Sequence, residues 1–287
     1  MASRPGPGSS TGSESARWSF LLLALIAPLG EGCVSASGIP GGPLPRGGAF
    51  TVSAAMAAPY AEGKADAISW NGRDSGSYRD ATADHTPFPM FARTGARLAP
   101  TSYFDIAADI GWIEGGAEFR IGLPEGTRPF PVALAGGYRA GWEPLFVNRF
   151  SPAFGYGRLE VYPLLWSGKD RRRLSAVLTG GLSHGDRYHS VTLPRMQFNL
   201  NGDTLGDPEV EILRRETRFE ATFGVDGRPH RGLLAGLYLM PYWVVNQSAP
   251  QQVYFDGAQG STLVRYQQDF GLLVALNVGY EFYFDQE

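Results

Sequence analysis

The sequence predicts an all-β protein that forms a single antiparallel, up-and-down β-barrel of about ten strands, within a range of about eight to twelve. After Gly48, apolar and polar residues alternate with period two, and no long segment shows the 3.6-residue period of an α-helix. Most alternating segments are about 10–14 residues long, whereas a typical globular strand has about 5–6. Short and long connections also alternate along the chain.

The composition excludes several classes of protein. The 287 residues are 43% hydrophobic, which gives the chain ample apolar surface for a folded core. The single Cys cannot form an intramolecular disulfide bond. The net charge of −3 provides no basic field, so we expect no nucleic-acid partner.

The N-terminus has the features of a secretory signal peptide, which we place at residues 1–36. Trp18–Leu29 is an apolar run of 12 residues, preceded by the positive charges of Arg4 and Arg17. A membrane-spanning helix needs about 20 apolar residues, so this run is too short to be one. Its length and the preceding charges are typical of a signal peptide.

Two processing sites are compatible with this segment. Residues 34–36 (VSA) form a small-x-small cleavage site, and residues 29–33 (LGEGC) resemble a bacterial lipobox in which Cys33 would be lipidated. Residues 34–48 are rich in Gly and Pro and are predicted to be a flexible tether. The barrel is then expected to occupy residues 48–287.

The first five strands are predicted where one face is apolar and the other is polar or small, because successive side chains of a strand point to opposite faces. They cover residues 47–57, 86–98, 102–111, 117–123 and 130–142. In the third of these strands Ile106 and Ile110 share one face, whereas Asp105 and Asp109 share the other.

The last five strands are predicted over residues 153–165, 172–184, 213–226, 231–246 and 267–284. The final strand has the clearest apolar face, which carries Leu272, Val274, Leu276, Val278, Tyr280, Phe282 and Phe284. The strands at 172–184 and 231–246 are apolar on both faces, so their orientation stays open. Ser190–Leu200 and Gln251–Phe255 are candidates for two further strands.

The connections differ in length on the two sides of the predicted barrel. The long loops, residues 58–85, 185–212 and 247–266, all fall on one side, and every connection on the other side is short. Short periplasmic turns with longer external loops are typical of outer-membrane barrels. Tilted membrane strands need about 9–11 residues, which the predicted strands provide. An even number of strands places both ends of the barrel chain on the periplasmic side.

The hairpin stretch Tyr103–Leu123 and the closing segment VALNVGYEFYF resemble bacterial outer-membrane β-barrel proteins, and the resemblance covers about residues 48–287. It implies transmembrane strands, a location in the outer membrane of a Gram-negative cell, and contact with outer-membrane lipids and the barrel-assembly machinery. The sequence departs from the pattern after Phe284, because Asp285-Gln286-Glu287 follows where many such proteins end on Phe. The alternative is a secreted or periplasmic lipocalin-like barrel with its apolar face inward.

In a membrane barrel the polar faces of the strands line the lumen, and a ten-strand lumen is narrow enough for side chains to fill. Opposite charges must pair there, because an unpaired charge in a water-poor interior is costly. We therefore expect a mostly blocked lumen. The predicted charge network consists of Arg93, Arg97, Asp105, Asp109, Glu118, Arg120, Arg139, Arg158, Glu160, Arg218, Glu220 and Glu281.

Four of the six Trp residues lie at or near the ends of predicted strands. They are Trp112, Trp142, Trp166 and Trp243. Because the Trp ring system combines an apolar body with a polar N–H, it favours the interface between membrane and water. We expect these residues to mark that interface.

The rim segment 183–190 (SHGDRYHS) carries His184, Asp186 and His189. Outer-membrane proteases of the omptin type use an Asp–His pair spaced by two, here in reverse order, and barrel lipid hydrolases pair a His with a Ser such as Ser190. A general base needs a geometry that sequence does not supply, so we assign no catalytic residue, no metal site and no cofactor. We expect a non-enzymatic surface protein that binds through its loops or supports the envelope. Passage of a small solute or apolar molecule, and a rim hydrolase, are the alternatives.

Overall fold

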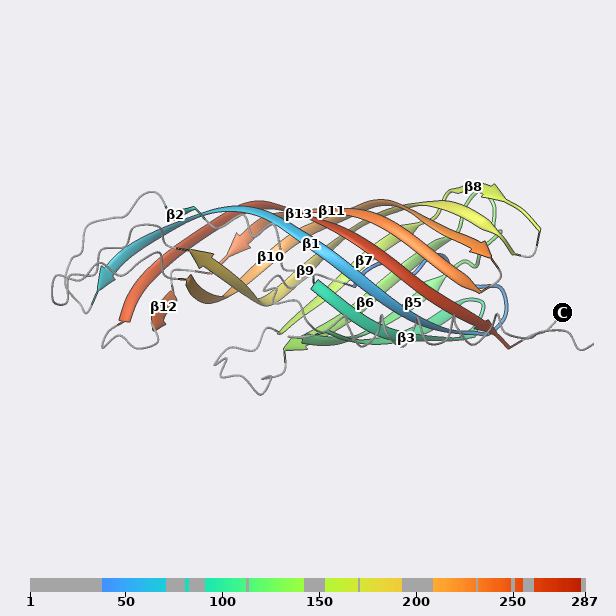
Figure 1. The fold of residues 1–287 in the computed structure, drawn as a ribbon, viewed down its shortest axis with the longest axis horizontal. Coiled ribbons are helices and arrows are strands. Elements are labelled where there is room, and N and C mark those ends of the chain that lie inside the picture. The colour runs from blue at the N-terminus through green and yellow to red at the C-terminus, as the bar shows by residue number, and fades with distance from the viewer. Residues whose placement is uncertain are drawn as a thin grey trace, which may run out of the picture.

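The computed structural model is a closed antiparallel β-barrel (Figure 1), and it describes residues 38–70, 81–82, 91–111, 114–141, 153–169, 171–192, 209–230, 232–248, 251–254 and 261–284. Within these residues, 10 long strands form the wall: β1 (Ala49–Trp70), β3 (Phe91–Thr101), β4 (Phe104–Gly111), β5 (Glu114–Gly122), β6 (Val132–Gly141), β7 (Ala153–Val161), β9 (Arg173–Thr192), β10 (Glu209–His230), β11 (Leu233–Gln247) and β13 (Ser261–Tyr283). Successive long strands are neighbours, and β13 pairs with β1 to close the barrel.

Each predicted strand corresponds to one long strand of the wall, so the predicted fold class is confirmed. Three short strands, β2 (Ala81–Thr82), β8 (Leu164–Ser167) and β12 (Gln251–Tyr254), pair only with β1, β9 and β13, respectively. The two candidate extra strands are not separate parts of the described wall, because β9 continues to Thr192 and β12 lies on an extension of β13. No helix among the described residues is long and apolar enough to cross a membrane.

The outward faces of the strands form an apolar belt. Its large side chains include Ile106, Ile110, Phe119, Ile121, Leu134, Leu159, Leu178, Leu182, Phe223, Leu237, Leu239, Val274, Leu276 and Val278. All of these are exposed on the outside of the barrel, whereas the charged side chains Asp105, Glu118, Arg120, Arg158, Glu160 and Asp226 of the same strands are buried inside it. This arrangement is the reverse of the lipocalin-like alternative.

Two rows of aromatic rings bound the apolar belt at its two ends. The row at the end with the long loops, called the outer row, is Phe219, Trp243 and Phe270. The row at the end with the short turns, called the inner row, is Phe50, Tyr280 and Phe282. A strand rises about 3.3 Å per residue and is tilted by about 40° in a barrel, so the stretch of β13 from Phe270 to Phe282 spans roughly 30 Å along the barrel axis. That height matches the hydrocarbon core of a bilayer, which is about 30 Å thick.

Several strands extend beyond the outer aromatic row. In Figure 1, β1 and β13 run well past the ends of β3–β7, on the side away from the C-terminus. These two strands stay paired as far as Trp70 and Thr262. The extensions of β1, β9, β10 and β13 occupy residues that the sequence assigned to long loops. The alternation of apolar and polar residues that predicts a membrane strand ends at the edge of the belt. The strands predicted from it therefore end there as well.

Aromatic side chains cover glycines on neighbouring strands at several points of the wall. Inside the barrel, Tyr156 pairs with Gly137, Tyr238 with Gly224 and Tyr242 with Gly271. A Cβ atom added to Gly224 would lie 2.7 Å from Cδ1 of the Tyr238 ring. Glycine is therefore needed where a ring lies flat on the strand beside it.

Candidate functional site

Charged side chains on the inward faces of the strands fill the lumen. All of the predicted network residues lie on these faces, and each of them takes part in at least one ion pair. The structure adds Glu114, Arg173, Arg187, Arg214 and Arg228 to the network, and Glu216 and Asp226, which the sequence also places on polar strand faces, take part in it. Because arginine is planar and carries five N–H donors, one side chain can join several carboxylates at once.

Arg120 on β5 is a centre of the network in the half nearest the short turns. Its side chain is 1% exposed. Nε donates to both oxygens of Asp105 on β4 at 3.1 Å, and Nη2 donates to the same carboxylate. Nη1 donates to Glu160 on β7 at 3.2 Å and to the backbone carbonyl of Gly42. Arg120 therefore links two strands of the wall with a segment inside the lumen.

Glu118, also on β5, accepts hydrogen bonds from residues on both sides of its strand. It accepts hydrogen bonds from Arg97 at 2.8 Å, from Arg158 at 2.7 Å and from the hydroxyl of Tyr156 at 2.8 Å. Arg158 donates to Glu160 as well, at 2.7 Å. The two carboxylates and their arginines thus form one continuous, charge-paired layer across β3–β7.

The outer half of the lumen carries a second set of ion pairs. They are Arg93–Glu114, Arg139–Glu114, Arg139–Asp109, Arg187–Glu216, Arg187–Glu220, Arg214–Glu216 and Arg218–Glu216. Two of these arginines also lie over aromatic rings, with Arg187 3.8 Å from the centroid of Phe154 and Arg218 4.1 Å from that of Tyr242. Both contacts shield a buried cation from solvent.

The predicted network omits Arg173, because the run Arg171-Arg172-Arg173 resembles an exposed basic turn. In the structure it is 7% exposed and pairs with Asp226 and Glu125, each at 3.4 Å. Its strand is apolar on both faces in the sequence, which left its orientation open. Arg173 has the same parity along β9 as the buried Ser175 and Ser183, and that parity is the signal that identifies it as inward-facing.

The inner side of β11 is apolar, together with parts of the strands beside it. Ala57, Tyr162, Val177, Tyr238, Met240, Tyr242, Leu273 and Ala275 form one buried cluster, which we call the apolar wall. This explains why the strand 231–246 carries apolar residues on both faces. The inner face of 172–184 adds only Val177 to this cluster and also carries the buried polar residues Arg173, Ser175 and Ser183. The lumen therefore has two chemically different sides. The apolar side lies mainly on β11 and β13, and the charged side extends from β3–β7 onto β9 and β10.

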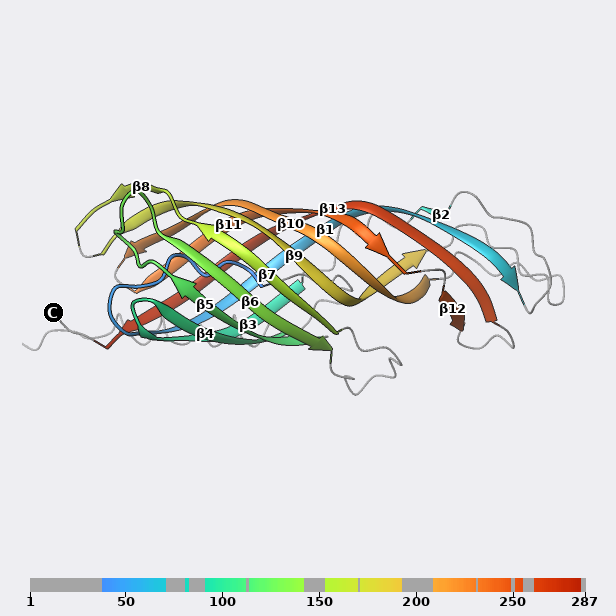
Figure 2. The same ribbon diagram turned by 180° about the vertical axis from the view of Figure 1, so that it is seen from behind.

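The N-terminal segment 38–48 runs inside the lumen between these two sides. Figure 2 shows it in dark blue, beside the short turns. Gly47 donates its N–H to Ser102 at 2.8 Å in the β3–β4 turn, and the carbonyl of Leu44 accepts from the N–H of Glu125 at 2.8 Å. Deeper in the lumen, Gly38 accepts from Arg158. The structure thus differs from the predicted flexible tether over residues 34–48, because the described part of that segment is held by the barrel interior.

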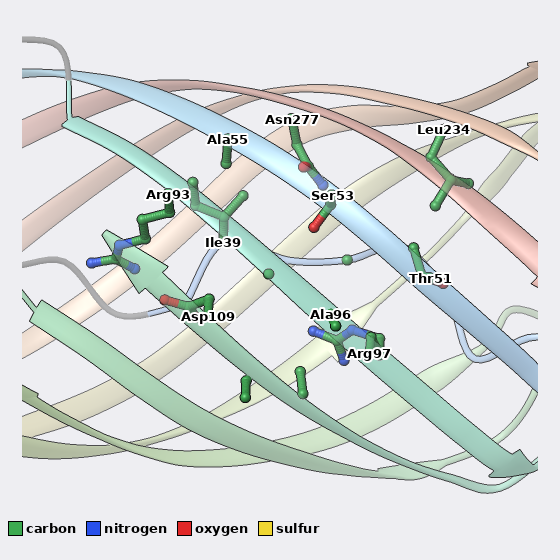
Figure 3. A pocket seen from close by; sticks show the side chains of 14 residues that line it. Ile39, Thr51, Ser53, Ala55, Arg93, Ala96, Arg97, Asp109, Leu234 and Asn277 are labelled. Atoms are coloured by element: carbon green, nitrogen blue, oxygen red, sulfur yellow. The ribbon is translucent and has the colours of Figure 1, made fainter. Parts of the chain in front are cut away.

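A cavity of about 60 Å³ remains beside this segment (Figure 3). Arg97 and Asp109 line it from one side and Ser53 and Asn277 from the other, with Ile39 of the N-terminal segment between them. Space of this size holds a few water molecules and no larger solute.

Of the residues considered for chemistry, His184 and Asp186 lie on the outer surface of the wall. His184 contacts the hydroxyl of Thr217 through Nδ1 at 2.8 Å, and both carboxylate oxygens of Asp186 accept from Arg215 at 2.9 Å. The two side chains are therefore engaged by different partners. The side chains of His189 and Ser190 lie outside the described residues. No group of three metal-binding side chains occurs among the residues that are described.

The remaining predicted residues are placed as follows. Trp243 belongs to the outer aromatic row and is 41% exposed. Trp166 lies on β8 at the end with the short turns and is 52% exposed. Trp112, Trp142 and Cys33, together with the predicted signal segment 1–36, fall outside the described residues.

Solved structures with a similar fold are outer-membrane barrels. The outer membrane protease OmpT from Escherichia coli has 11% identity and a TM-score of 0.38, covering 82% of this chain and 97% of its own. Ail, the attachment invasion locus protein of Yersinia pestis, has 12% identity and a TM-score of 0.26, covering 82% of this chain and 99% of its own. The translocator domain of the autotransporter NalP from Neisseria meningitidis has 11% identity and a TM-score of 0.23, covering 95% and 98%.

No protein-family model matches the sequence, and no curated protein matches it either. The likeness to the three solved structures concerns the barrel fold alone and assigns no activity to this chain. The function must therefore be argued from the lumen and the outer surface.

Proposed function

We propose that this protein spans the outer membrane of a Gram-negative cell as a closed, non-enzymatic scaffold, and that it presents its outer strand extensions and loops for binding at the cell surface. The filled lumen is the observation that carries this proposal. Layers of buried Arg–carboxylate pairs and an internal segment occupy the space that a pore would need. A rigid, sealed barrel is suited to holding loops in fixed positions.

The apolar belt and its two aromatic rows support the membrane location. Soluble monomers rarely expose contiguous apolar patches larger than a few hundred Å². Here the apolar side chains encircle the barrel over a height that fits a bilayer, and lipid tails would cover them. The outer extensions of β1 and β13 lie past the outer aromatic row and would stand in the water outside the cell.

Replacing Leu276 in the middle of the belt with arginine tests this location. Leu276 is 55% exposed on the outer face of β13. We expect Leu276→Arg to lower the free energy of unfolding in lipid vesicles by about 2–4 kcal/mol, because the guanidinium would face the bilayer midplane. Val245→Arg is the matched control: Val245 lies past Trp243 on β11 and is 67% exposed, so its loss should be about 1 kcal/mol or less. Urea titration measures both variants. Equal losses in the free energy of unfolding would mean that the bilayer surrounds a different part of the barrel.

The proposed scaffold also predicts the conductance of the wild-type protein and the surface labelling of epitope-tagged forms. In planar bilayers it should give no stable open channel, because the charged layers and the N-terminal segment fill the lumen. An epitope inserted between Thr192 and Glu209 should be reached by antibody on intact cells, whereas the same epitope between His230 and Leu233 should need permeabilised cells. Stable conductance would favour passage of a small solute. The opposite labelling pattern would reverse the orientation of the barrel.

We further propose that the surface His184 and Asp186 have no catalytic role. Each already has a partner on the outer wall, Thr217 and Arg215, respectively. The purified barrel should therefore cleave neither a peptide library nor a phospholipid ester above background. Hydrolysis that disappears in His184→Ala would instead favour a rim hydrolase.

A further inference from the structure

The geometry of the lumen points to a binding site for an extended, glycine- and proline-rich peptide. We propose that residues 38–45 (GIPGGPLP) occupy this site in cis as a displaceable plug, and that their removal opens the barrel. This goes beyond the scaffold role proposed above. Three features of the contact between segment and wall carry the inference.

The charged side of the lumen holds the segment by its backbone. Arg158 donates to the carbonyl of Gly38, and Arg120 donates to the carbonyl of Gly42. The backbone N–H of Glu125, in the turn between β5 and β6, donates to the carbonyl of Leu44 at 2.8 Å. Three carbonyls along the segment thus meet fixed donors on the same side, which is how a protein recognises an extended peptide main chain.

The glycines lie where the charged wall approaches most closely. A Cβ atom at Gly38 would lie 2.6 Å from Oε2 of Glu118 and 2.7 Å from the hydroxyl of Tyr156. At Gly42 it would lie 2.7 Å from Oδ1 of Asp226, and the backbone there has φ +78°, a conformation that L residues with a side chain rarely adopt. Glu118 and Asp226 are held by ion pairs with arginines and Tyr156 by its hydrogen bond to Glu118, so these side chains have little freedom to move away.

The prolines and apolar residues fit the rest of the site. Pro40, Pro43 and Pro45 are buried, and because proline has no N–H, none of them leaves a backbone donor to be satisfied inside the lumen. Leu44 is fully buried, and Ile39 packs against the apolar wall. The segment therefore meets the two sides of the lumen with two kinds of contact, carbonyls on one and aliphatic side chains on the other.

The wall does not depend on the segment for its charge balance, which makes the plug displaceable. Arg158 retains Glu118 and Glu160 without it, and Arg120 retains Asp105 and Glu160. Each arginine would lose one hydrogen bond to a carbonyl, which water can replace. The volume of the segment would then join the cavity of about 60 Å³ beside it.

The test compares the full chain with a variant that lacks residues 38–45. In planar bilayers the deletion variant should give open channels, and added GIPGGPLP peptide should close them. A fluorescent form of this peptide should bind the folded deletion variant at least about tenfold more tightly than it binds the wild-type barrel, whose site is occupied. A peptide with both central glycines changed to leucine should lose at least about tenfold in affinity and should not close the channels.

A point variant keeps the proposal testable if the deletion variant gives no folded band on an unheated gel. Gly42→Leu should force the segment out and give open channels in the full chain. Gly157→Leu is the matched control, because its nearest neighbour is 3.9 Å away and the position faces outward, so that barrel should stay closed. Closed channels in both the folded deletion variant and Gly42→Leu, or no preference for the native peptide, would overturn the proposal. The closure of the wild-type lumen and its surface labelling are measured separately, so they would stand.

Discussion

Replacing Arg120 with methionine is expected to lower the free energy of unfolding by about 3–5 kcal/mol, because it removes one partner from a buried charge network. The side chain donates to Asp105, Glu160 and the carbonyl of Gly42 from a position that is 1% exposed. Methionine fills similar space but offers no donor. The lumen would then hold one uncompensated negative charge, and two carboxylates would each lose a hydrogen-bond partner. Urea titration of the folded barrel in lipid vesicles measures the loss.

Two further variants separate charge from geometry. Arg120→Lys keeps the charge, but an ammonium group cannot reproduce the planar fork that reaches two carboxylates, so we expect a smaller loss than with methionine. Arg215→Met is the matched control at the surface. Arg215 pairs with Asp186, but its side chain is 63% exposed, so its replacement should lower the free energy of unfolding far less than that of Arg120. If Arg120→Met and Arg215→Met lowered the free energy of unfolding equally, water would have access to the ion pairs of the lumen.

The wall of the barrel could be predicted from the sequence because the belt gives a strong signal. In strands such as β4, Asp105 faces the lumen and Ile106 faces outward. The inner face is polar and the outer face apolar, so the sequence alternates clearly with period two. That signal disappears in two places for physical reasons. In the extension of β1 beyond the belt the sequence has no continuous apolar face, and on the apolar wall around Tyr238 both faces are apolar. Strand ends and orientations in those parts could not be derived from alternation alone.

The position of residues 38–48 could not be predicted from composition. Gly and Pro are the residues of a flexible linker, and the same residues fit a narrow lumen where backbone must lie against side chains. The difference lies in the partners: Arg120 and Arg158 are far from this segment in sequence, and only the closure of β1 on β13 brings them to it. A contact of such long sequence separation leaves no local pattern.

Replacing Tyr238 with alanine is expected to lower the free energy of unfolding by about 3–5 kcal/mol, comparable to the loss for Arg120. Tyr238 is fully buried in the apolar wall, and its ring covers Gly224 on the neighbouring strand. Alanine would leave a cavity that the rigid strands cannot close. Tyr238→Phe keeps the ring and removes only the hydroxyl that donates to Asp226 at 3.2 Å, so we expect a loss of about 0.5–1.5 kcal/mol.

Tyr103→Ala is the control for this pair of variants. Tyr103 lies in the turn between β3 and β4 and is 59% exposed, so its removal should cost much less than that of Tyr238. Equal losses for Tyr103→Ala and Tyr238→Ala would mean that the lumen is loosely packed and wet. In a wet lumen the ion pairs around Arg120 would be screened, and the loss expected for Arg120→Met would fall as well. The two predictions therefore succeed or fail together, because both depend on a lumen that excludes water.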